Sequence, residues 1–186
     1  MVDWDKRYRS GFYDKNAEPH RLLQEFWRTI PGKTVIDIAA GTGRDAIFLA
    51  SKGFCVCGLE KSIEAIDIAR KNAESAGHCV SIIKGDAETL PFKKHSADGV
   101  IIFYFLERRV MRDISYILKK GGILIYETFL KRQNDIDTRK RDSRYLLTDG
   151  ELISFFGDFE LLFYEETISA SADKKRAIAR FIGRKR

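Results

Sequence analysis

Short apolar runs alternate with amphipathic helical stretches over most of this chain, and that alternation restricts its fold more than any other feature. The runs that read as strands lie at residues 33–37, 54–59, 79–84, 98–104 and 123–129. The stretches that read as helices lie between them, at residues 44–51, 62–76 and 107–120. Strands that are apolar throughout and separated by helices indicate a parallel sheet covered on both faces, so we expect an α/β fold.

Each expected helix has signals at its ends. Ser62 is placed to cap the second helix, and Gly53, Gly77 and Gly121 stand where the three helices should end. Lys119 and Lys120 then fall in the last turn of the third helix, where positive charge is favourable.

After residue 130 the pattern changes. Residues 131–147 are polar and charged, and residues 149–156 form a short amphipathic stretch. Two strand-like runs follow at 159–166 and 176–183, and the small polar segment Ala170–Asp173 lies between them. Consecutive strands joined in this way pair as an antiparallel hairpin. We expect five parallel strands followed by that hairpin, all within one domain.

Length and composition narrow the class of protein. The 186 residues, 44% of them hydrophobic, suit a single domain with an ordinary core. The longest apolar run, Gly99–Leu106, is far shorter than the roughly 20 residues of a membrane-spanning helix. The first ten residues are charged and have no apolar segment, so no signal peptide is expected. Three cysteines without a C-x-x-C spacing argue against a disulfide framework and a zinc site. These features together predict a cytoplasmic protein with no membrane partner.

The net charge of +6 is concentrated at one end of the chain. Residues 174–186 hold seven basic and no acidic side chains, whereas the other 173 residues have a net charge of −1. A charged last strand and tail explain this excess without a polyanionic partner. We therefore regard nucleic acid as the less favoured partner.

A glycine-rich loop, Asp37-Ile-Ala-Ala-Gly-Thr-Gly43, joins the first strand to the first helix. Glycines at such a loop let a ligand approach the backbone at the helix N-terminus. Glu60 ends the second strand, where a carboxylate can accept both hydroxyl protons of a ribose; a solvated acid is the alternative. Asp86 follows the third strand, where it can accept the exocyclic amine of adenine or simply form an Asx turn.

Asp37 distinguishes between two nucleoside cofactors. Its carboxylate adjoins the expected ligand site, where it would repel the diphosphate of NAD and attract ammonium and sulfonium groups. The charge at Asp37 therefore favours S-adenosyl-L-methionine.

At this point the sequence resembles the class I S-adenosylmethionine-dependent methyltransferases. The resemblance covers about residues 30–185 and is carried by four motifs: Val35–Arg44, Glu60, Gly85–Phe92 and Leu118–Leu124. It implies a three-layer, Rossmann-like fold with a seven-stranded sheet whose last two strands form the antiparallel hairpin. A narrower similarity, to the tellurite-resistance-type or small-molecule subgroup, lies in Trp4–Tyr8, Tyr126–Phe129, Leu146–Phe156 and Tyr164–Glu166. The chain then divides into an N-terminal lid and helix, a cofactor-binding half and a C-terminal helix and hairpin, at residues 1–30, 31–130 and 131–186.

The resemblance also implies a set of residues that contact the cofactor. They are Trp4, Tyr8, Asp37, Ala39, Gly41, Gly43, Glu60, Lys61, Ser62, Asp86, Ala87, Phe103 and Tyr104. The loop backbone would surround the methionine part, Glu60 would hold the ribose, and Asp86 would take the adenine amine. The sequence departs from the family at Ala39, where glycine is usual, and that methyl group calls for a small backbone shift.

Two aromatic groups have two interpretations each. Trp4, Tyr8, Phe12 and Tyr13 either cover the sheet edge or close over the cofactor as a lid, and we expect the lid for Trp4 and Tyr8. Phe103 either continues the core or lines the channel where donor and acceptor meet, whereas the amphipathic Tyr104 fits that channel better. The three histidines, at positions 20, 78 and 95, have no spacing for metal or triad chemistry, so we expect surface or helix-end positions.

The expected reaction is transfer of a methyl group to a small-molecule acceptor by in-line displacement at the sulfonium methyl. Tyr104, Arg108 and Arg144 are the candidate acceptor-binding residues, and no metal is expected. A thiolate or a selenium or tellurium oxyanion would need no general base; a phenol or carbon acid would need one, and no residue stands out for that role. Phe103–Glu107 stands where base N-methyltransferases carry Asn/Asp-Pro-Pro-Tyr, which disfavours that activity.

Two other functions stay open. One is a non-catalytic S-adenosylmethionine-binding module that regulates a partner. The other is an NAD(P)-dependent oxidoreductase, which fits less well because Ala46 stands where a third glycine is expected.

Overall fold

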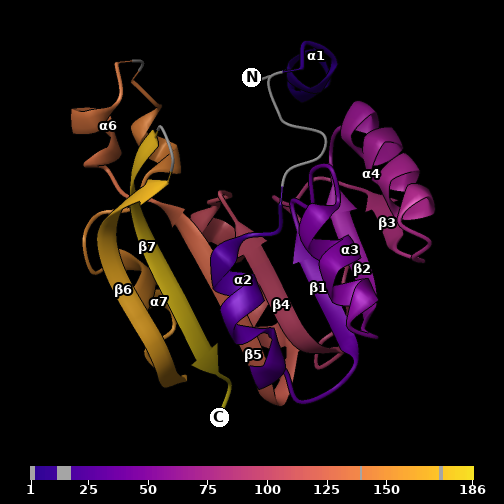
Figure 1. Ribbon diagram of the computed structural model, residues 1–186. Helices are drawn as coiled ribbons and strands as arrows, with labels where there is room; N and C mark the ends of the chain where they lie inside the picture. The colour runs from indigo at the N-terminus through magenta and orange to yellow at the C-terminus, as the bar shows by residue number, and fades with distance from the viewer. Residues whose placement is uncertain (1–2, 12–17, 139, 172–173) are drawn as a thin grey trace.

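The computed structural model describes residues 3–11, 18–138, 140–171 and 174–186, and their strands form one seven-stranded sheet (Figure 1). The order across the sheet is β3-β2-β1-β4-β5-β7-β6. The strands are β1 (Thr34–Ile38), β2 (Cys55–Glu60), β3 (Ser81–Lys84), β4 (Ala97–Phe103), β5 (Leu118–Phe129), β6 (Glu160–Ser171) and β7 (Lys174–Arg184). The first five are parallel, and β7 pairs antiparallel with both β5 and β6. The fold class expected from the sequence is therefore confirmed.

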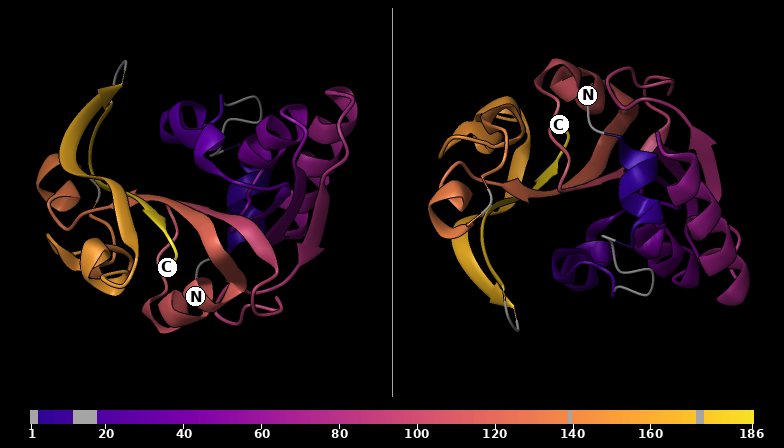
Figure 2. Two further views of the ribbon diagram at one scale, coloured as in Figure 1. Left: turned by 90° about the horizontal axis from the view of Figure 1, so that it is seen from below. Right: turned by 90° about the horizontal axis from the view of Figure 1, so that it is seen from above.

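Helices cover both faces of the sheet. The α-helices are α1 (Trp4–Arg9), α2 (Arg21–Phe26), α3 (Arg44–Ser51), α4 (Ile63–Ser75), α5 (Met111–Ile117), α6 (Gln133–Ile136) and α7 (Glu151–Phe155). Short 3-10 turns lie at η1 (Trp27–Thr29), η2 (Arg108–Val110) and η3 (Ser143–Tyr145). In Figures 1 and 2, α2, α3 and α4 lie on one side of the sheet and α7 on the other, which gives three layers.

The core is divided by the sheet because neighbouring strand residues point to opposite faces. Val35, Ile101 and Ile123 belong to a buried cluster that includes Leu22 and Leu23 of α2 and Ala46 and Leu49 of α3. The adjacent residues Ile36, Val100 and Leu124 belong to a second cluster with Met111, Ile114 and Ile117 of α5 and Leu152 of α7. Two cores on two faces explain why the strands read as continuous apolar runs.

The third helix is shorter than its sequence pattern predicts. It ends at Ile117, and Leu118 already has the extended backbone of β5 (φ −66°, ψ 137°). Lys119 and Lys120 therefore lie in a strand, and Lys119 Nζ contacts Asp98 Oδ1 at 2.8 Å. The cation at the end of α5 is instead Lys185, whose Nζ donates to the carbonyls of Ser115 and Leu118, each at 2.8 Å. The prediction that Lys119 and Lys120 lie in the last turn of this helix was wrong. Lys185, from the end of the chain, binds the carbonyl groups at the C-terminal end of α5 instead.

The hairpin carries most of the basic C-terminal segment into the sheet. Arg180 on β7 contacts Glu127 on β5 and Glu165 on β6, at 2.8 and 2.9 Å. Arg184 contacts Glu160 at 2.8 Å. These basic side chains are balanced by acids on the neighbouring strands. Both strands are longer than predicted, since Ala170 and Ser171 belong to β6; residues 172–173 of the expected turn lie outside the described residues.

None of the helices in the described residues is both long and apolar enough to cross a membrane.

Candidate active site

The candidate site lies along the edge of the sheet where the parallel strands end. Because β1 lies between β2 and β4, the chain reverses its direction across the sheet next to β1, and ligands of open α/β sheets bind at such a point. Asp37 is the next-to-last residue of β1, Glu60 ends β2, Asp86 follows β3 and Tyr104 follows β4. The parallel register therefore carries these four side chains to one edge.

The loop between β1 and α3 uses three residues with left-handed backbone. Ala39, Gly41 and Gly43 have φ values of 60°, 56° and 77°. A Cβ on Gly41 would lie 2.9 Å from the hydroxyl oxygen of Tyr8, and one on Gly43 would lie 2.9 Å from Cβ of Ala69. Glycine is needed at both positions, for conformation and for space. Ala39 adopts the same left-handed conformation although it carries a Cβ, so its backbone is strained where a glycine would not be.

Glu60 holds this loop from the neighbouring strand. Its carboxylate accepts the backbone N–H of Gly41 at 2.8 Å and those of Lys61 and Ser62 at 2.9 Å. The residue is only 7% exposed, and that burial raises the pKa of Glu60 although the three backbone donors oppose the rise. A carboxylate has about four acceptor positions, so Glu60 keeps capacity for a further hydroxyl donor.

Asp37 is the most unusual carboxyl group of the site. It is 3% exposed, and within the described chain Oδ2 has no hydrogen-bond partner. Burial, with Asp45 and Glu60 nearby, raises the pKa of Asp37 well above its ordinary value, and Arg44 opposes the rise. A buried carboxylate oxygen normally has a cation or a hydrogen-bond donor beside it, and Oδ2 of Asp37 has neither within the described residues. An ammonium group fits that need, so the residues present fit S-adenosylmethionine.

Asp86 is engaged in a different way. Its Oδ2 lies 2.5 Å from Nζ of Lys61, and this bond lowers the pKa of the Asp86 carboxyl group. Both side chains are 43% exposed, so the pair can open at little cost. Asp86 is thus connected to the Glu60 strand end through Lys61, and Ala87 beside it is buried.

Helix α1 lies over the glycine loop and the start of α4. Asp5 accepts a hydrogen bond from the Ser62 hydroxyl at 2.6 Å, and Arg9 pairs with Glu64 at 3.1 Å. Tyr8 is buried with its hydroxyl next to Gly41, whereas Trp4 is 37% exposed. The Tyr8 hydroxyl therefore lies directly against the glycine loop. Phe12 and Tyr13 lie outside the described residues.

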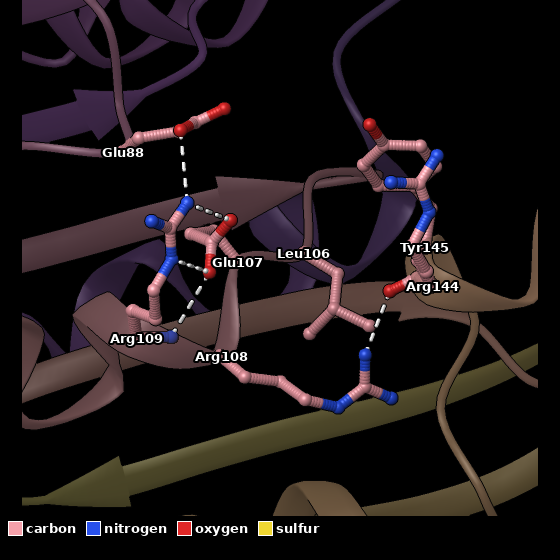
Figure 3. A pocket seen from close by; sticks show the side chains of 7 residues that line it. All are labelled: Glu88, Leu106, Glu107, Arg108, Arg109, Arg144 and Tyr145. Carbon is pink, nitrogen blue, oxygen red and sulfur yellow. Dashed lines mark hydrogen bonds and ion pairs between the residues drawn. The ribbon is translucent and has the colours of Figure 1, made fainter.

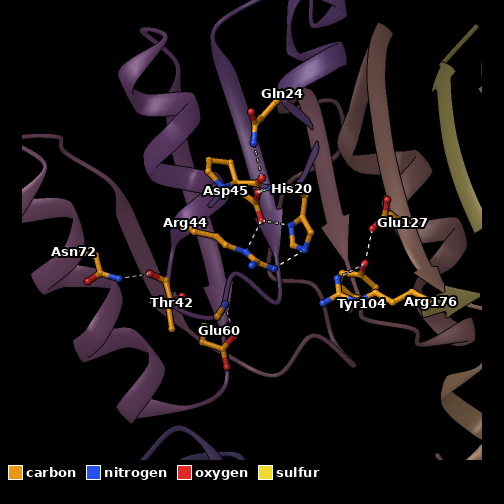
Figure 4. Close-up of polar contacts among 12 residues, drawn as sticks. His20, Gln24, Thr42, Arg44, Asp45, Glu60, Asn72, Tyr104, Glu127 and Arg176 are labelled. Atoms are coloured by element: carbon orange, nitrogen blue, oxygen red, sulfur yellow. Dashed lines mark hydrogen bonds and ion pairs between the residues drawn. The ribbon is translucent and has the colours of Figure 1, made fainter. Parts of the chain in front are cut away.

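Tyr104 begins a polar network on the other side of β4 (Figure 4). Its hydroxyl donates to Glu127 Oε1 at 2.6 Å and accepts from Arg176 at 3.0 Å. Its backbone is left-handed, with φ 55°, which is costly for a tyrosine and marks a position held by its surroundings. Burial and Glu127 raise the pKa of Tyr104, so its hydroxyl stays protonated. Phe103 before it is buried and belongs to the core.

His20 lies at the candidate site, although no pattern in the amino-acid sequence indicated this. Its Nδ1 lies 2.7 Å from Asp45 Oδ2, and its Nε2 lies 2.5 Å from a terminal nitrogen of Arg44 (Figure 4). The ring stacks on Phe103, with centroids 4.1 Å apart and planes 9° apart. His20 does precede a helix, as expected, but its side chain is nearly buried. A contact between positions 25 residues apart has no signature in local spacing.

Arg108 and Arg144 have partners within the protein. The Arg108 guanidinium binds both carboxylate oxygens of Glu151, at 2.5 and 3.1 Å, and donates to the carbonyls of Arg144 and Leu146. Arg144 pairs with Asp142 at 2.6 Å and is largely exposed. This geometry favours a structural role for Arg108.

A cavity of about 400 Å³ lies beside these arginines. Figure 3 shows its lining residues, which are Glu88, Leu106, Glu107, Arg108, Arg109, Arg144 and Tyr145. It adjoins the Asp86 loop but is lined by neither Asp37 nor Glu60. The cavity is thus separate from the glycine loop.

Several proteins similar to this chain carry methyltransferase names. A family model described as "Methyltransferase domain" matches residues 35–122. The demethylmenaquinone methyltransferase of Thermotoga maritima is 28% identical over 187 aligned positions, which cover 87% of this chain and 80% of that protein. A 23S rRNA (uracil(747)-C(5))-methyltransferase of Pyrococcus abyssi is 32% identical over 79% of this chain, but over only 36% of its own length.

Solved structures show the same fold. TehB from Haemophilus influenzae superposes with a TM-score of 0.79 and 19% sequence identity, over 98% of this chain and 67% of its own. A structure described as a SAM-dependent methyltransferase from Methanosarcina mazei has a TM-score of 0.70 and 20% identity, over 91% of this chain and 99% of its own.

Proposed function

Since the chain is a class I S-adenosylmethionine-dependent methyltransferase, we propose that it methylates a small molecule bound beside Tyr104. One observation carries the placement of the cofactor: Oδ2 of Asp37 is buried and, within the described residues, unpaired, next to a glycine loop with left-handed backbone. When bound, S-adenosylmethionine supplies a methyl group on a sulfonium sulfur, already activated for displacement. The protein has to bind it, exclude water and position the acceptor.

We assign the cofactor contacts as follows. Asp37 pairs with the ammonium group, and the backbone at Ala39, Gly41 and Gly43 surrounds the methionine part. Glu60 accepts the ribose hydroxyl protons, and its bonds to Gly41 and Ser62 keep it in position. These assignments combine charge and burial with the expected position of each residue at its strand end.

The adenine is assigned to the Asp86 side of the site. Asp86 accepts the adenine amine once Lys61 turns away, and the backbone of Ala87 lies against the ring. Lys61 and Ser62 flank the ribose. The half-exposed pair between Lys61 and Asp86 supports this, because its exposure makes opening inexpensive.

Helix α1 acts as a lid in this proposal. The Tyr8 hydroxyl lies against Gly41 of the glycine loop, and Trp4 is a partly exposed residue of the same helix. The lid keeps water from the site, which favours methyl transfer to the acceptor.

The acceptor side is built around Tyr104 and Phe103. The name of the Thermotoga maritima relative supports a small-molecule acceptor, and so do the ion pairs of Arg180 and Arg184, which occupy basic side chains that a nucleic acid would need. Arg144 is exposed and can reach an anionic acceptor, whereas Arg108 is committed to Glu151. The tellurite-resistance-type subgroup, the single-domain organisation and a cytoplasmic location also remain predictions.

Binding measurements test the cofactor site first. Calorimetry with S-adenosylhomocysteine should show one site per chain, and NADH at the same concentration should give no heat. Thermal shifts should agree, because a ligand that binds the folded state raises stability. Stabilisation by NADH alone would overturn the proposal.

A methyl-transfer screen then separates an enzyme from a regulatory module. Radiolabelled S-adenosylmethionine is incubated with panels of phenols, thiols and oxyanions. Product from one panel supports the proposal, and tight cofactor binding without product in any panel favours the non-catalytic module.

A further inference from the structure

His20 and Asp45 form a histidine–carboxylate pair that the cofactor assignments do not use. Asp45 Oδ1 accepts the backbone N–H of His20 at 2.8 Å, and Oδ2 contacts the ring Nδ1 at 2.7 Å. Both side chains are nearly buried, with exposed fractions of 9% and 7%. One carboxylate therefore fixes the backbone and the ring of the same histidine.

The neighbours of the ring determine which nitrogen carries the proton. Asp45 accepts from Nδ1, and Arg44 can only donate, so its contact at 2.5 Å makes Nε2 the acceptor. The neutral ring thus has its proton on Nδ1 and its lone pair on Nε2. That is the state of a histidine ready to accept a proton, with a carboxylate behind it to stabilise the cation that results.

The ring is also fixed in place by aromatic contacts. It stacks on Phe103 and lies 5.2 Å from the ring of Tyr104, centroid to centroid. Figure 4 shows His20 between Arg44 on one side and Tyr104 on the other. Phe103 ends β4 and Tyr104 follows it, where the acceptor side of the site begins. The position of His20 thus joins the glycine loop to that side.

Charged and titratable groups face His20 from each element around it. Asp45 and Arg44 belong to α3, and Asp37 on β1 interacts with both of them. Tyr104 follows β4, and its hydroxyl is bound to Glu127 on β5 and Arg176 on β7. Burial and Glu127 raise the pKa of Tyr104, so its hydroxyl stays a donor, and Nε2 of His20 is the accepting nitrogen beside it.

We propose that His20 is the catalytic residue that deprotonates the acceptor, and that the acceptor is a hydroxylated small molecule, a phenol or enol, whose hydroxyl binds at Nε2 of His20, next to Tyr104. This rests on the methyltransferase function proposed above. Asp45 is the positioning residue of the pair. Arg44, a third exposed, turns from Nε2 and pairs with the oxyanion that forms there.

The step balances without any further reactant. The proton of the acceptor hydroxyl moves to Nε2 of His20, and its electron pair stays on the oxygen. That atom forms a bond to the methyl carbon as the carbon–sulfur bond breaks, with the bonding pair left on sulfur. His20 then returns its proton to solvent. A thiolate acceptor would need no such step.

His20→Asn is the variant of choice, because the asparagine amide can still donate to Asp45 while the accepting nitrogen is removed. His95→Asn is its matched control: His95 lies beside Leu118 and Lys185 and has φ 54°, a conformation that asparagine tolerates. Both variants, the wild type and Asp45→Asn are first compared for S-adenosylhomocysteine affinity by calorimetry.

Rates are then measured over pH 5–9 with paired probes, naphthols and the corresponding naphthalenethiols. For His20→Asn we expect a loss of about 10²–10⁴-fold with naphthols, a flattened acid limb of the pH profile, and less than about threefold loss with thiols. S-adenosylhomocysteine affinity and the rates of His95→Asn should be unchanged. Asp45→Asn should lose about 10²-fold or more with naphthols and retain its thiol rate.

A readout without turnover completes the test. Long-range ¹H–¹⁵N spectra of the ligand-free protein should show His20 as the Nδ1-protonated tautomer, and Asp45→Asn should remove that preference. Equal losses with naphthols and thiols, a parallel loss of S-adenosylhomocysteine affinity, an Nε2-protonated ring, or a wild type that methylates only thiols would each overturn the assignment of His20. Failure of the wild type to bind S-adenosylhomocysteine would instead overturn the function itself.

Discussion

Glu60 Oε2 accepts the backbone N–H of Gly41 at 2.8 Å, so the acid that ends β2 holds the glycine loop that follows β1. One carboxylate thereby orders the loop, and in the function proposed above it also binds the ribose. The sequence places Glu60 at the ribose, but only the structure shows that it also supports the loop.

Glu60→Gln should weaken S-adenosylhomocysteine binding by about 1–3 kcal/mol, because charge-assisted hydrogen bonds are lost. The amide nitrogen would also face one of the backbone donors at Gly41, Lys61 or Ser62, so the melting temperature should fall. Calorimetry and thermal melting measure the two effects. Glu74→Gln, at an exposed position of α4, is the control and should change neither. Unchanged affinity in Glu60→Gln would remove this residue from the site.

The glycine loop allows a paired test at Ala39 and Gly41. Ala39→Gly relieves a left-handed backbone, so its free energy of unfolding should stay within about 1 kcal/mol of the wild type, and cofactor affinity should rise. Gly41→Val adds a Cβ that would meet the Tyr8 hydroxyl and should abolish binding. Denaturation in urea and calorimetry provide the measurements. A Gly41→Val protein that still binds would show that the loop is only a turn.

Asp37→Asn should make the protein more stable and less able to bind its cofactor. The pKa of Asp37 is raised in the folded state above 3.8, its ordinary value, so above pH 3.8 the folded protein holds the extra proton. Stability from this group is therefore present at low pH and lost as pH rises through the raised pKa. Asparagine avoids that loss, and we expect about 1–3 kcal/mol of stabilisation at pH 7.

Urea denaturation between pH 4 and pH 8 tests this, with calorimetry for affinity. The difference between Asp37→Asn and wild type should grow with pH, whereas the exposed control Asp67→Asn should show no such trend. A variant less stable than the wild type at pH 7 would contradict the account of Asp37 as an uncompensated carboxylate.

Glu151→Gln tests the structural role of Arg108. The Arg108 guanidinium lowers the pKa of Glu151 to about 2, so the pair stabilises the fold above pH 4.5 and is lost as pH falls from 4.5 toward 2. With the partial exposure of Arg108, a cost of about 1–2 kcal/mol at pH 7 is expected. S-adenosylhomocysteine affinity should not change. A loss of acceptor binding in Arg108→Gln without any loss of stability would return Arg108 to the acceptor site.

Removal of residues 1–11 tests the lid. Helix α1 contacts the rest of the protein mainly at α4, through Asp5 and Arg9, so stability should change by less than about 1 kcal/mol. Without Tyr8 over Gly41, S-adenosylhomocysteine should dissociate about tenfold faster in stopped-flow measurements. Asp5→Asn should have a smaller effect in the same direction, and Lys6→Gln none. A collapse of the melting temperature would instead make α1 part of the core.

The sequence predicts those parts of the fold and site that depend on local patterns. The strands, their parallel order and the final hairpin follow from apolar runs and helix signals, and Asp37 and Glu60 follow from their positions at strand ends. The boundary between α5 and β5 could not be predicted from local patterns because it depends on distant contacts. Lys119 contacts Asp98, and Lys185 binds the carbonyl groups at the end of the helix. His20 was missed for a related reason: its partners, Asp45 and Phe103, come from two other segments.

The strand order separates two tasks within one sheet. Acids at the ends of β1, β2 and β3 lie on one side of the reversal, whereas Tyr104, Glu127 and Arg176 come from β4, β5 and β7 on the other. In the function proposed above, mutations around Tyr104 should therefore change which acceptor is methylated and leave the cofactor site intact. The sheet thus lets one set of loops be altered for a new acceptor without disturbing the loops assigned to the methyl donor.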